Sequence, residues 1–247
     1  MSTEAGPLHM LVRALGRLVA LDEADAAALL SLPFRPLRLP PLGYVVREGD
    51  RPCEIGLLTS GFAFRHRILG DGGRQILSLH LPGDLLDAQS GLFEASDYNV
   101  QALTPAELAM VPAETLRARM AERPRLAEAM LKAMMIEASI SREWIANVGR
   151  RNARARLAHL LCEQVARMRQ AGFARDGAYE LPMTQEQLAD CTGLTSVHVN
   201  RMLKQLETDG LIVRIRRAIR VPRWEELCRA ADFDPRYLHL EANVVAA

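Results

Sequence analysis

The chain has 247 residues, of which 49% are hydrophobic and 25% charged. That composition is typical of a globular protein, and the length suits one large domain or two ordinary ones. No apolar run reaches about 18 residues, and the N-terminus lacks a basic start followed by an apolar core. We therefore expect a cytoplasmic protein with neither a membrane span nor a secretory signal.

The net charge is +1, but it is unevenly distributed. Residues 150–223 carry 14 Arg and Lys against 7 Asp and Glu, residues 1–149 carry 15 against 18, and residues 224–247 carry 2 against 5. A basic segment in an otherwise acidic chain favours binding to a polyanion, and a solvated, arginine-rich helix face is the alternative. The four cysteines, at 53, 162, 191 and 228, have no spacing typical of a zinc site or disulfide framework. We expect free thiols and no metal.

The N-terminal half predicts a small β domain behind a helical start. Residues 8–32 are apolar-rich and helical in pattern. After Pro33, short apolar runs are separated by turn signals; these runs are 44–46, 55–58, 62–68 and 75–81. Many short strands at close spacing predict an all-β barrel or roll, and DGG at 71–73 predicts a hairpin between the last two runs.

A helical region follows from Pro112. Pro124 suits the first turn of a helix. Apolar residues then recur at spacings of three and four up to Gly149, with Glu137 interrupting them: Leu126, Met130, Ala133, Ile140, Trp144 and Val148. This pattern predicts a helix of about 25 residues and about 37 Å, longer than a small barrel is wide. We expect part of its stripe to pack on its own domain and part to meet a second copy. A second helix over 150–170 and a loop or short strand over 171–183 follow.

Residues 184–212, TQEQLADCTGLTSVHVNRMLKQLETDGLI, predict two short helices joined at Gly193. Thr184 and Gln187 match a capping box, and Thr195 can cap the second helix. The second helix would bury Val199, Met202, Leu203 and Leu206 and expose Ser196, His198, Asn200, Arg201 and Lys204. This is the helix-turn-helix arrangement, whose second helix fits the major groove of DNA. A helical hairpin in a protein that does not bind DNA is the alternative.

The next residues, DGLIVRIRRAIRV at 209–221, alternate apolar residues with arginines. The alternation after Asp-Gly predicts a β-hairpin wing, with Arg214, Arg216, Arg217 and Arg220 directed toward the DNA backbone. Arginine–phosphate contacts add affinity that depends on salt and not on sequence. The wing and the local charge together favour DNA binding over the plain helical hairpin.

These parts, in this order, resemble the Crp/Fnr family of bacterial transcription regulators over roughly residues 35–225. The resemblance rests on YVVREGDRPCEIGLLTSGFAFRHR, GRQILSLHLPGDLL, the long helix and the motif at 184–212. It implies an α+β fold in three parts. These are a cyclic-nucleotide-binding-like β-roll (double-stranded β-helix or jelly-roll-like) at 1–111, a dimerisation helix region at 112–149, and a winged helix-turn-helix at 150–247. It also implies a homodimer, a palindromic operator on double-stranded DNA and, for an activator, RNA polymerase as a partner.

The resemblance places base-reading residues at Ser196, Val197, Asn200 and Arg201. Val197 departs from the glutamate of many members, and valine can touch a thymine methyl group but cannot accept a hydrogen bond from cytosine. The preferred half-site should differ accordingly. Residues implied to contact the DNA backbone are Thr184, Gln185, Thr195, His198, Lys204, Arg214, Arg216 and Arg217.

The sensor segment departs from cyclic-nucleotide-binding members. Their phosphate-binding Arg-Ser or Arg-Thr pair falls near Ser96 and Asp97, and no Arg lies between 84 and 116. An acid there repels a phosphate, so we expect no cyclic nucleotide bound in the usual way. No cysteine precedes Cys53, which argues against the family's iron–sulfur mode. The haem-ligand positions of carbon-monoxide-sensing members are occupied by Asp87 and Gln89. No cofactor is predicted, while haem at His66 or His80 and a small-molecule effector stay open.

Two further hypotheses concern Cys191 and the function of the barrel. Cys191, at the end of the first short helix, is a candidate redox switch, with a buried, inert thiol as the alternative. The rival function is a ligand-binding barrel whose helix-turn-helix serves protein contacts. Because His66 and His80 lack a carboxylate or third-histidine partner, we expect no enzyme.

Overall fold

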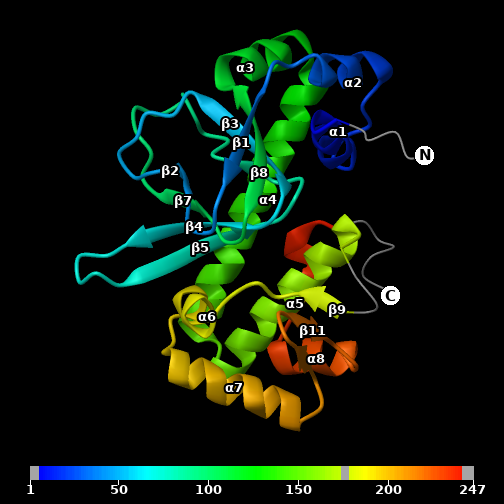
Figure 1. Ribbon diagram of the computed structural model, residues 1–247. Coiled ribbons are helices and arrows are strands. Elements are labelled where there is room, and N and C mark those ends of the chain that lie inside the picture. Colours follow the sequence, from blue (N-terminus) through cyan, green and yellow to red (C-terminus); the bar gives the residue numbers. More distant parts are fainter. Residues whose placement is uncertain (1–5, 174–177, 241–247) are drawn as a thin grey trace. The chain divides into compact units, whose positions relative to one another are not determined.

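The structure, a computed structural model, describes residues 6–173 and 178–240 (Figure 1). These residues form two compact units. One contains the chain up to residue 67 together with 78–137, and the other contains 68–77 together with the chain from 138 onward. Within the predicted loop or strand at 171–183, residues 174–177 lie outside the described part.

The predicted β-roll lies in the first unit, apart from residues 68–77. Its strands form two four-stranded sheets, in the orders β1-β8-β3-β6 and β2-β7-β4-β5. The strands are β1 (Arg35–Leu39), β2 (Tyr44–Val46), β3 (Glu54–Ser60), β4 (Ala63–Ile68), β5 (Arg74–His80), β6 (Leu85–Leu86), β7 (Asn99–Ala102) and β8 (Ala106–Pro112). All four predicted strand runs fall on strands, and the predicted hairpin joins neighbouring β4 and β5. The inner faces bury side chains such as Leu58, Phe64 and Val100.

Helices cover one end of this roll. They are α1 (Leu8–Gly16), α2 (Glu23–Leu30) and α3 (Ala113–Glu122). The helical stretch expected at 8–32 is therefore two helices. The break falls before Asp22, whose side chain accepts a 2.8 Å hydrogen bond from the Asp25 backbone and completes a capping box. A capping box of this kind starts a new helix. The apolar pattern alone does not show such a break, so it predicted a single helix.

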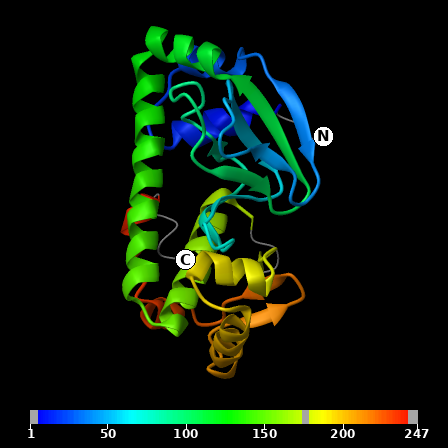
Figure 2. The same cartoon turned by 90° about the vertical axis from the view of Figure 1, so that its left-hand side faces the viewer.

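The long helix α4 (Pro124–Arg150) begins at Pro124 as predicted and runs without a break (Figure 2). One side of it buries Leu126, Met130 and Trp144. A second group of apolar side chains on α4 is exposed, among them Leu131 at 57%, Met135 at 55% and Ile145 at 73%. One apolar side of α4 thus packs on its own chain, and a second has no cover in the monomer.

The second unit is a winged helix-turn-helix. Its helices are α5 (Ala153–Ala171), α6 (Gln185–Thr192), α7 (Ser196–Thr208), α8 (Trp224–Ala231) and the short 3-10 helix η1 (Pro235–Leu238). The strands β9 (Ala178–Glu180), β10 (Val213–Ile215) and β11 (Ala218–Arg220) form one sheet in the order β10-β11-β9. Helix α5 is the centre of the unit and packs against α6, α7, α8 and η1.

A buried carboxylate connects three helices of this unit. Glu163 on α5 is fully buried and accepts hydrogen bonds from Trp144 Nε1 at 2.9 Å and from Tyr237 Oη at 2.8 Å. Burial raises the pKa of the Glu163 carboxyl, against the lowering effects of Arg167 and of the two donors. Because Trp144 belongs to α4 and Tyr237 to η1, this cluster ties the end of α4 and the C-terminal turn to α5.

Candidate nucleic-acid interface

The turn between α6 and α7 is built from short-range polar contacts. Thr184 Oγ1 accepts a hydrogen bond from the Gln187 backbone at 3.1 Å, and Gln187 Oε1 accepts one from the Thr184 backbone at 2.9 Å. Gly193 ends α6 with φ at +62°, a conformation that favours glycine. Thr195 caps α7 by accepting from the His198 backbone at 3.3 Å. The predicted capping box, turn and cap are all present.

Helix α7 separates its residues cleanly by exposure. Val199, Met202, Leu203 and Leu206 are buried as predicted. Ser196 and Arg201 are exposed, and the Val197 side chain is 79% exposed, an unusual position for an aliphatic residue within a helix. Asn200 is half-buried and accepts a 3.3 Å hydrogen bond from Gln185 Nε2 on α6. The first turns of α7 thus present one aliphatic, two polar and one cationic side chain on the side away from the core.

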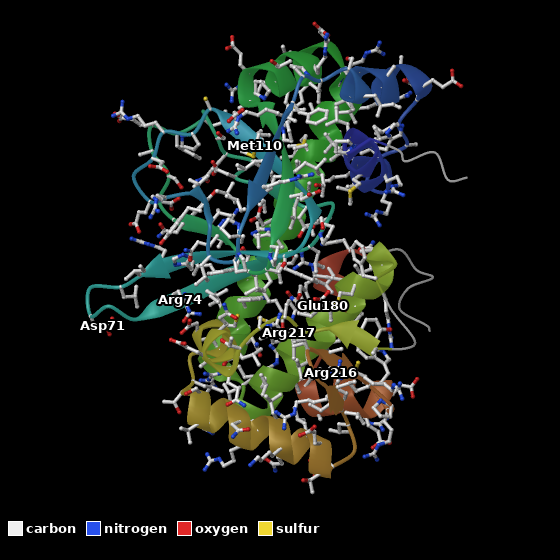
Figure 3. The ribbon with its side chains drawn as sticks, in the orientation of Figure 1. Asp71, Arg74, Met110, Glu180, Arg216 and Arg217 are labelled. Atoms are coloured by element: carbon white, nitrogen blue, oxygen red, sulfur yellow. The ribbon has the colours of Figure 1, made fainter. Side chains whose placement is uncertain are left out.

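The wing is the hairpin of β10 and β11, which Figure 3 shows with its turn residues Arg216 and Arg217 labelled. Val213 pairs with Arg220 and Ile215 with Ala218, so the turn contains only these two arginines. Arg216 has a φ of +54°, in the left-handed region that a two-residue hairpin turn requires. Both arginines are exposed. The predicted hairpin is confirmed, and β9 adds a third strand to it.

The structure separates the basic residues of this segment into two groups. Several arginines bind groups of their own unit: Arg151 pairs with Glu143 at 2.8 Å, Arg154 with Asp209 at 2.5 Å, and Arg156 donates to the Thr192 carbonyl at 2.7 Å. Among the others, Arg150 is exposed at the end of α4. The remaining exposed basic residues without an ion pair within the described residues lie on α7 or the wing: Arg201, Lys204, Arg216, Arg217 and Arg220. The positive charge left for a polyanion is therefore concentrated there.

Arg214 belongs to the first group, although the sequence suggested a DNA contact for it. Its guanidinium pairs with Glu207 at 2.5 Å, and its backbone N–H donates to the same carboxylate at 3.3 Å. These bonds lower the pKa of Glu207. Arg214 thus fastens the wing to the end of α7. The alternating pattern could not reveal this, because the partner lies on another element.

Thr184 and Thr195 are also engaged locally, since each hydroxyl serves as a helix cap. Gln185 and Lys204 are exposed, whereas His198 is half-buried. The predicted backbone contacts of these residues stay predictions.

The β-roll contains a buried polar network that the sequence did not reveal. The Arg65 side chain is only 14% exposed, forms an ion pair with Glu137 and lies 4.2 Å above the Tyr98 ring. Tyr98 Oη donates to Asp87 at 2.7 Å, and burial raises the pKa of Asp87. The signal in the sequence was a pair of opposite charges, Arg65 within a strand and Glu137 within an apolar seam. Nothing in the sequence showed that they meet.

The segment that aligns with the phosphate-binding pair of cyclic-nucleotide-binding members makes contacts within the roll. Ser96 is buried and its hydroxyl donates to the Tyr98 carbonyl at 3.0 Å. Asp97 is exposed and accepts from Gln89 Nε2 at 3.2 Å.

Both histidines left open as haem ligands are buried in the roll. The His66 ring lies 5.2 Å from the Phe64 ring, and His80 Nε2 is 2.9 Å from Ser78 Oγ. Within residues 6–173 and 178–240, no group of three His, Cys, Asp or Glu side chains is arranged to hold a metal ion.

Cys191 is 2% exposed, and burial, followed by the charge of Asp190, raises its pKa well above the usual range. This environment favours an inert, protonated thiol. The redox hypothesis for Cys191 stays a prediction that this environment does not support.

Comparison with known protein families gives two matches. The model of the cyclic nucleotide-binding domain matches residues 36–123, and that of the Crp-like helix-turn-helix domain matches residues 155–230. The chain is 30% identical over 172 residues to the transcriptional activator protein FnrL of Cereibacter sphaeroides, covering 68% of each chain. The chain belongs to the Crp/Fnr family of DNA-binding transcription regulators.

Other Crp/Fnr proteins support the same family assignment. A probable transcriptional activator of Rhizobium leguminosarum is 30% identical over 187 residues, covering 75% of this chain and 76% of the relative. The solved structure of FixK2 from Bradyrhizobium japonicum has the same fold, with a TM-score of 0.73 at 22% identity, over 81% of this chain and 98% of FixK2. Among the described residues we find no helix whose length and hydropathy would suit a bilayer span.

Proposed function

We propose that this Crp/Fnr protein acts as a homodimer that binds a palindromic operator through α7. The observation that carries the proposal is the exposed N-terminal half of α7, where Val197 is 79% exposed beside polar and cationic neighbours. An exposed aliphatic side chain gains little from water, but it gains a contact when a thymine methyl group meets it in the major groove. The curated relatives are transcriptional activators, which supports the same reading.

Base reading is assigned to Ser196, Val197, Asn200 and Arg201. Arg201 is exposed and has no ion pair within the described residues, so its guanidinium is available to grip guanine with two hydrogen bonds. Asn200 suits adenine, and its bond to Gln185 would hold the amide in position as the helix enters the groove. Ser196 can donate to or accept from a base edge.

Backbone contacts are assigned to two places beside the groove. Lys204 on α7 and the wing arginines Arg216 and Arg217 supply charge. Thr184, Gln185, Thr195 and His198 lie at or near the starts of α6 and α7, where free backbone N–H groups favour phosphates. A contact from Arg214 would need the guanidinium to exchange Glu207 for a phosphate.

The dimer is proposed through the exposed stripe of α4. Leu131, Met134, Met135 and Ile145 recur at spacings that place them on one side of the helix, about a third of a turn from the buried side. A helix that is apolar on two sides has a second surface to cover, and pairing with the same helix of another copy covers it. Two copies of α7 about 34 Å apart would meet successive major grooves.

The roll is proposed not to bind cyclic nucleotide in the usual way. Asp97 stands where a phosphate would need a cation, and Arg65 in the same unit is already neutralised by Glu137. If a phosphate replaced the Glu137 carboxylate as the partner of Arg65, Glu137 would be left unpaired in a half-buried site, which costs free energy.

An activator of this kind would also contact RNA polymerase, and we place the protein in the cytoplasm with its DNA.

Retention on DNA and calorimetry test this proposal together. The purified protein should bind duplex DNA at low salt, and titration of the DNA-free protein with cyclic AMP should give no heat of binding. Absence of retention on DNA at low salt would instead favour the rival function, a ligand-binding barrel whose helix-turn-helix contacts proteins. Saturable cyclic AMP binding would overturn the assignment of the roll.

A further inference from the structure

Three polar contacts join the end of α4 to α5 inside the second unit, which contains α4 from residue 138 onward. In order of distance from the corner at residues 151–152, they are Asn147 Nδ2 to the Arg156 carbonyl at 3.2 Å, Glu143 to His159 Nε2 at 3.1 Å and Trp144 Nε1 to Glu163 at 2.9 Å. Glu163 lies ten residues beyond the first residue of α5, which is about 15 Å by the helical rise. A contact so far from a corner restrains the angle between two helices more than a contact beside it.

Glu163 also holds the C-terminal turn. Its side chain is fully buried, and Tyr237 Oη on η1 donates to it at 2.8 Å. The two donors, Trp144 and Tyr237, come from different elements and converge on one carboxylate of α5. A hydrogen bond is directional, and a buried polar group that loses its partner costs free energy. A turn of either element relative to α5 therefore breaks a bond to Glu163.

The same turn of α4 carries a residue of the proposed dimer seam. Trp144 is 7% exposed, whereas Ile145, the next residue, is 73% exposed. Trp144 thus contacts Glu163, while Ile145 is left for the partner copy. Helix α5 in turn packs against α7, the proposed recognition helix. Trp144 and Glu163 therefore connect the seam to the recognition helix of the same chain.

We propose that Glu163 is a positioning residue that fixes the angle between α4 and α5 and so makes the dimer selective for the spacing of the operator half-sites. Being fully buried, Glu163 touches neither base nor phosphate and acts through Trp144 and Tyr237. The inference rests on the proposed function, because spacing has a meaning only for a dimer that binds two half-sites.

The geometry of DNA makes this angle matter. One added base pair moves the second half-site by about 3.4 Å along the helix axis and about 35° around it. A dimer whose two α7 helices are held at a fixed separation matches one spacing, and a longer or shorter spacer costs binding free energy. A dimer with a loose angle between α4 and α5 can follow the displaced half-site. Loss of the bonds to Glu163 should therefore broaden the range of accepted spacers.

A cluster that only stabilised the fold would have a different effect. Loss of folded protein lowers binding to every duplex by the same factor, so it leaves the ratio of affinities between two spacers unchanged. That ratio separates a positioning role from a purely structural one.

Competition between palindromic duplexes measures the ratio. The probes are the palindrome that the parent protein selects from a random library and versions with one base pair added to or removed from its centre. We expect Tyr237→Phe, which loses one bond to Glu163, to lower the preference for the selected spacing about fivefold. That factor corresponds to about 1 kcal/mol, the net contribution of one hydrogen bond. Glu163→Leu, which loses both bonds and keeps a side chain of similar size, should lower the preference further.

Two variants serve as controls. Glu163→Gln should keep the preference, because its amide oxygen can accept from Trp144 and its amide nitrogen can donate to Tyr237. Tyr179→Phe should also keep it, because this variant loses a hydroxyl that bonds Arg169 at 2.7 Å and not Glu163.

An unchanged ratio in Tyr237→Phe and, if it folds, in Glu163→Leu would overturn the proposal, even if both variants bound every duplex more weakly. A loss in Glu163→Gln as large as that in Tyr237→Phe would also overturn it, because the hydrogen bonds would then not set the spacing. Failure of the parent protein to select any palindrome would instead overturn the proposed function, and this inference with it.

Discussion

At the scale of single residues, Arg201 carries the largest share of the proposed base specificity. It is exposed near the start of α7 and has no ion pair within the described residues. We predict that Arg201→Ala weakens binding to the specific site by about 1–3 kcal/mol and relaxes the choice of base at one position of each half-site. Fluorescence anisotropy on the specific duplex and on single-base variants measures both effects.

Arg229→Ala is the matched control, because Arg229 is an exposed arginine on α8 with no ion pair within the described residues. It should leave base preference unchanged. If Arg201→Ala discriminated between the duplexes as well as the parent does, Arg201 would not read a base.

The buried His159 makes the free energy of unfolding depend on pH. Its ring is 1% exposed and stacks on Tyr237 at 5.8 Å between centroids. Burial first, and then the charge of Arg151, lower the pKa of His159 to about 3. Glu143 lies 3.1 Å from His159 Nε2, but Arg151 already neutralises it at 2.8 Å. The folded protein therefore keeps this histidine neutral.

Proton uptake by the unfolded chain sets the direction of this pH dependence. Between about pH 6.5 and pH 3, the unfolded chain binds a proton at His159 and the folded chain does not, so acid favours unfolding. We predict that this group alone lowers the free energy of unfolding by about 2 kcal/mol between pH 7 and pH 5. Urea unfolding of the parent and of His159→Phe at both pH values isolates the effect. Equal losses in the two proteins would show that His159 titrates normally when folded.

The sequence predicted local contacts between residues better than distant ones. The Thr184–Gln187 capping box and the Thr195 cap were visible, because both partners lie within one helical turn. The pairs Arg214–Glu207 and Arg65–Glu137 were not, because each joins two elements whose meeting depends on the whole fold.

At the scale of elements, the wing should supply affinity without specificity. Arg217 lies exposed in the two-residue turn between β10 and β11. We predict that Arg217→Ala weakens binding to all duplexes by a similar factor and reduces the slope of log affinity against log salt by about 1. Affinities measured on specific and scrambled DNA over a range of salt concentrations give both quantities.

Arg220→Ala serves for comparison, because Arg220 is an exposed wing arginine away from the turn and paired in the ladder with Val213. A loss at Arg217 confined to the specific duplex would mean that the turn reads bases and not phosphates.

Elements with a strong periodic signal were predicted well, and short or polar ones were not. The four apolar runs of the roll and the helices α4, α6 and α7 are where the pattern placed them. Strand β6 has only two residues, and β7 (NVQA) has polar side chains that are nevertheless buried. A polar strand enclosed by neighbours looks like a loop in sequence, because burial comes from the other strands.

At the scale of the whole molecule, the exposed stripe of α4 should hold two copies together. Ile145 is 73% exposed, the largest exposure among the large apolar residues of this helix. We predict that Ile145→Glu converts the dimer to a monomer at micromolar concentration, because it puts a charge into the apolar seam of both chains. Sedimentation equilibrium measures the change, and specific DNA affinity should fall with it.

Glu128→Gln is the control, since Glu128 is exposed on the same helix and pairs with Lys132 at 2.8 Å. This variant should stay dimeric. A parent protein that is monomeric at these concentrations would contradict the proposed seam.

The architecture of the whole molecule could be predicted from the sequence because its parts occur in a distinctive order. A roll, a long helix and a winged helix-turn-helix together matched the Crp/Fnr family, and the family models and relatives confirm it. The effector could not be predicted from the sequence. The interior of the roll is set by groups such as Arg65, Asp87 and Tyr98, which meet only in the folded unit.

The most direct test is selection of bound duplexes from a random DNA library, with reduced protein and no added ligand. We predict enrichment of a palindrome whose half-sites lie about one helical turn apart. We also predict thymine at the position facing Val197 and guanine at the position facing Arg201, with the guanine preference lost in Arg201→Ala. If an intact dimer enriched no sequence, or enriched sites without twofold symmetry, the proposed binding of a palindromic operator through α7 would be wrong.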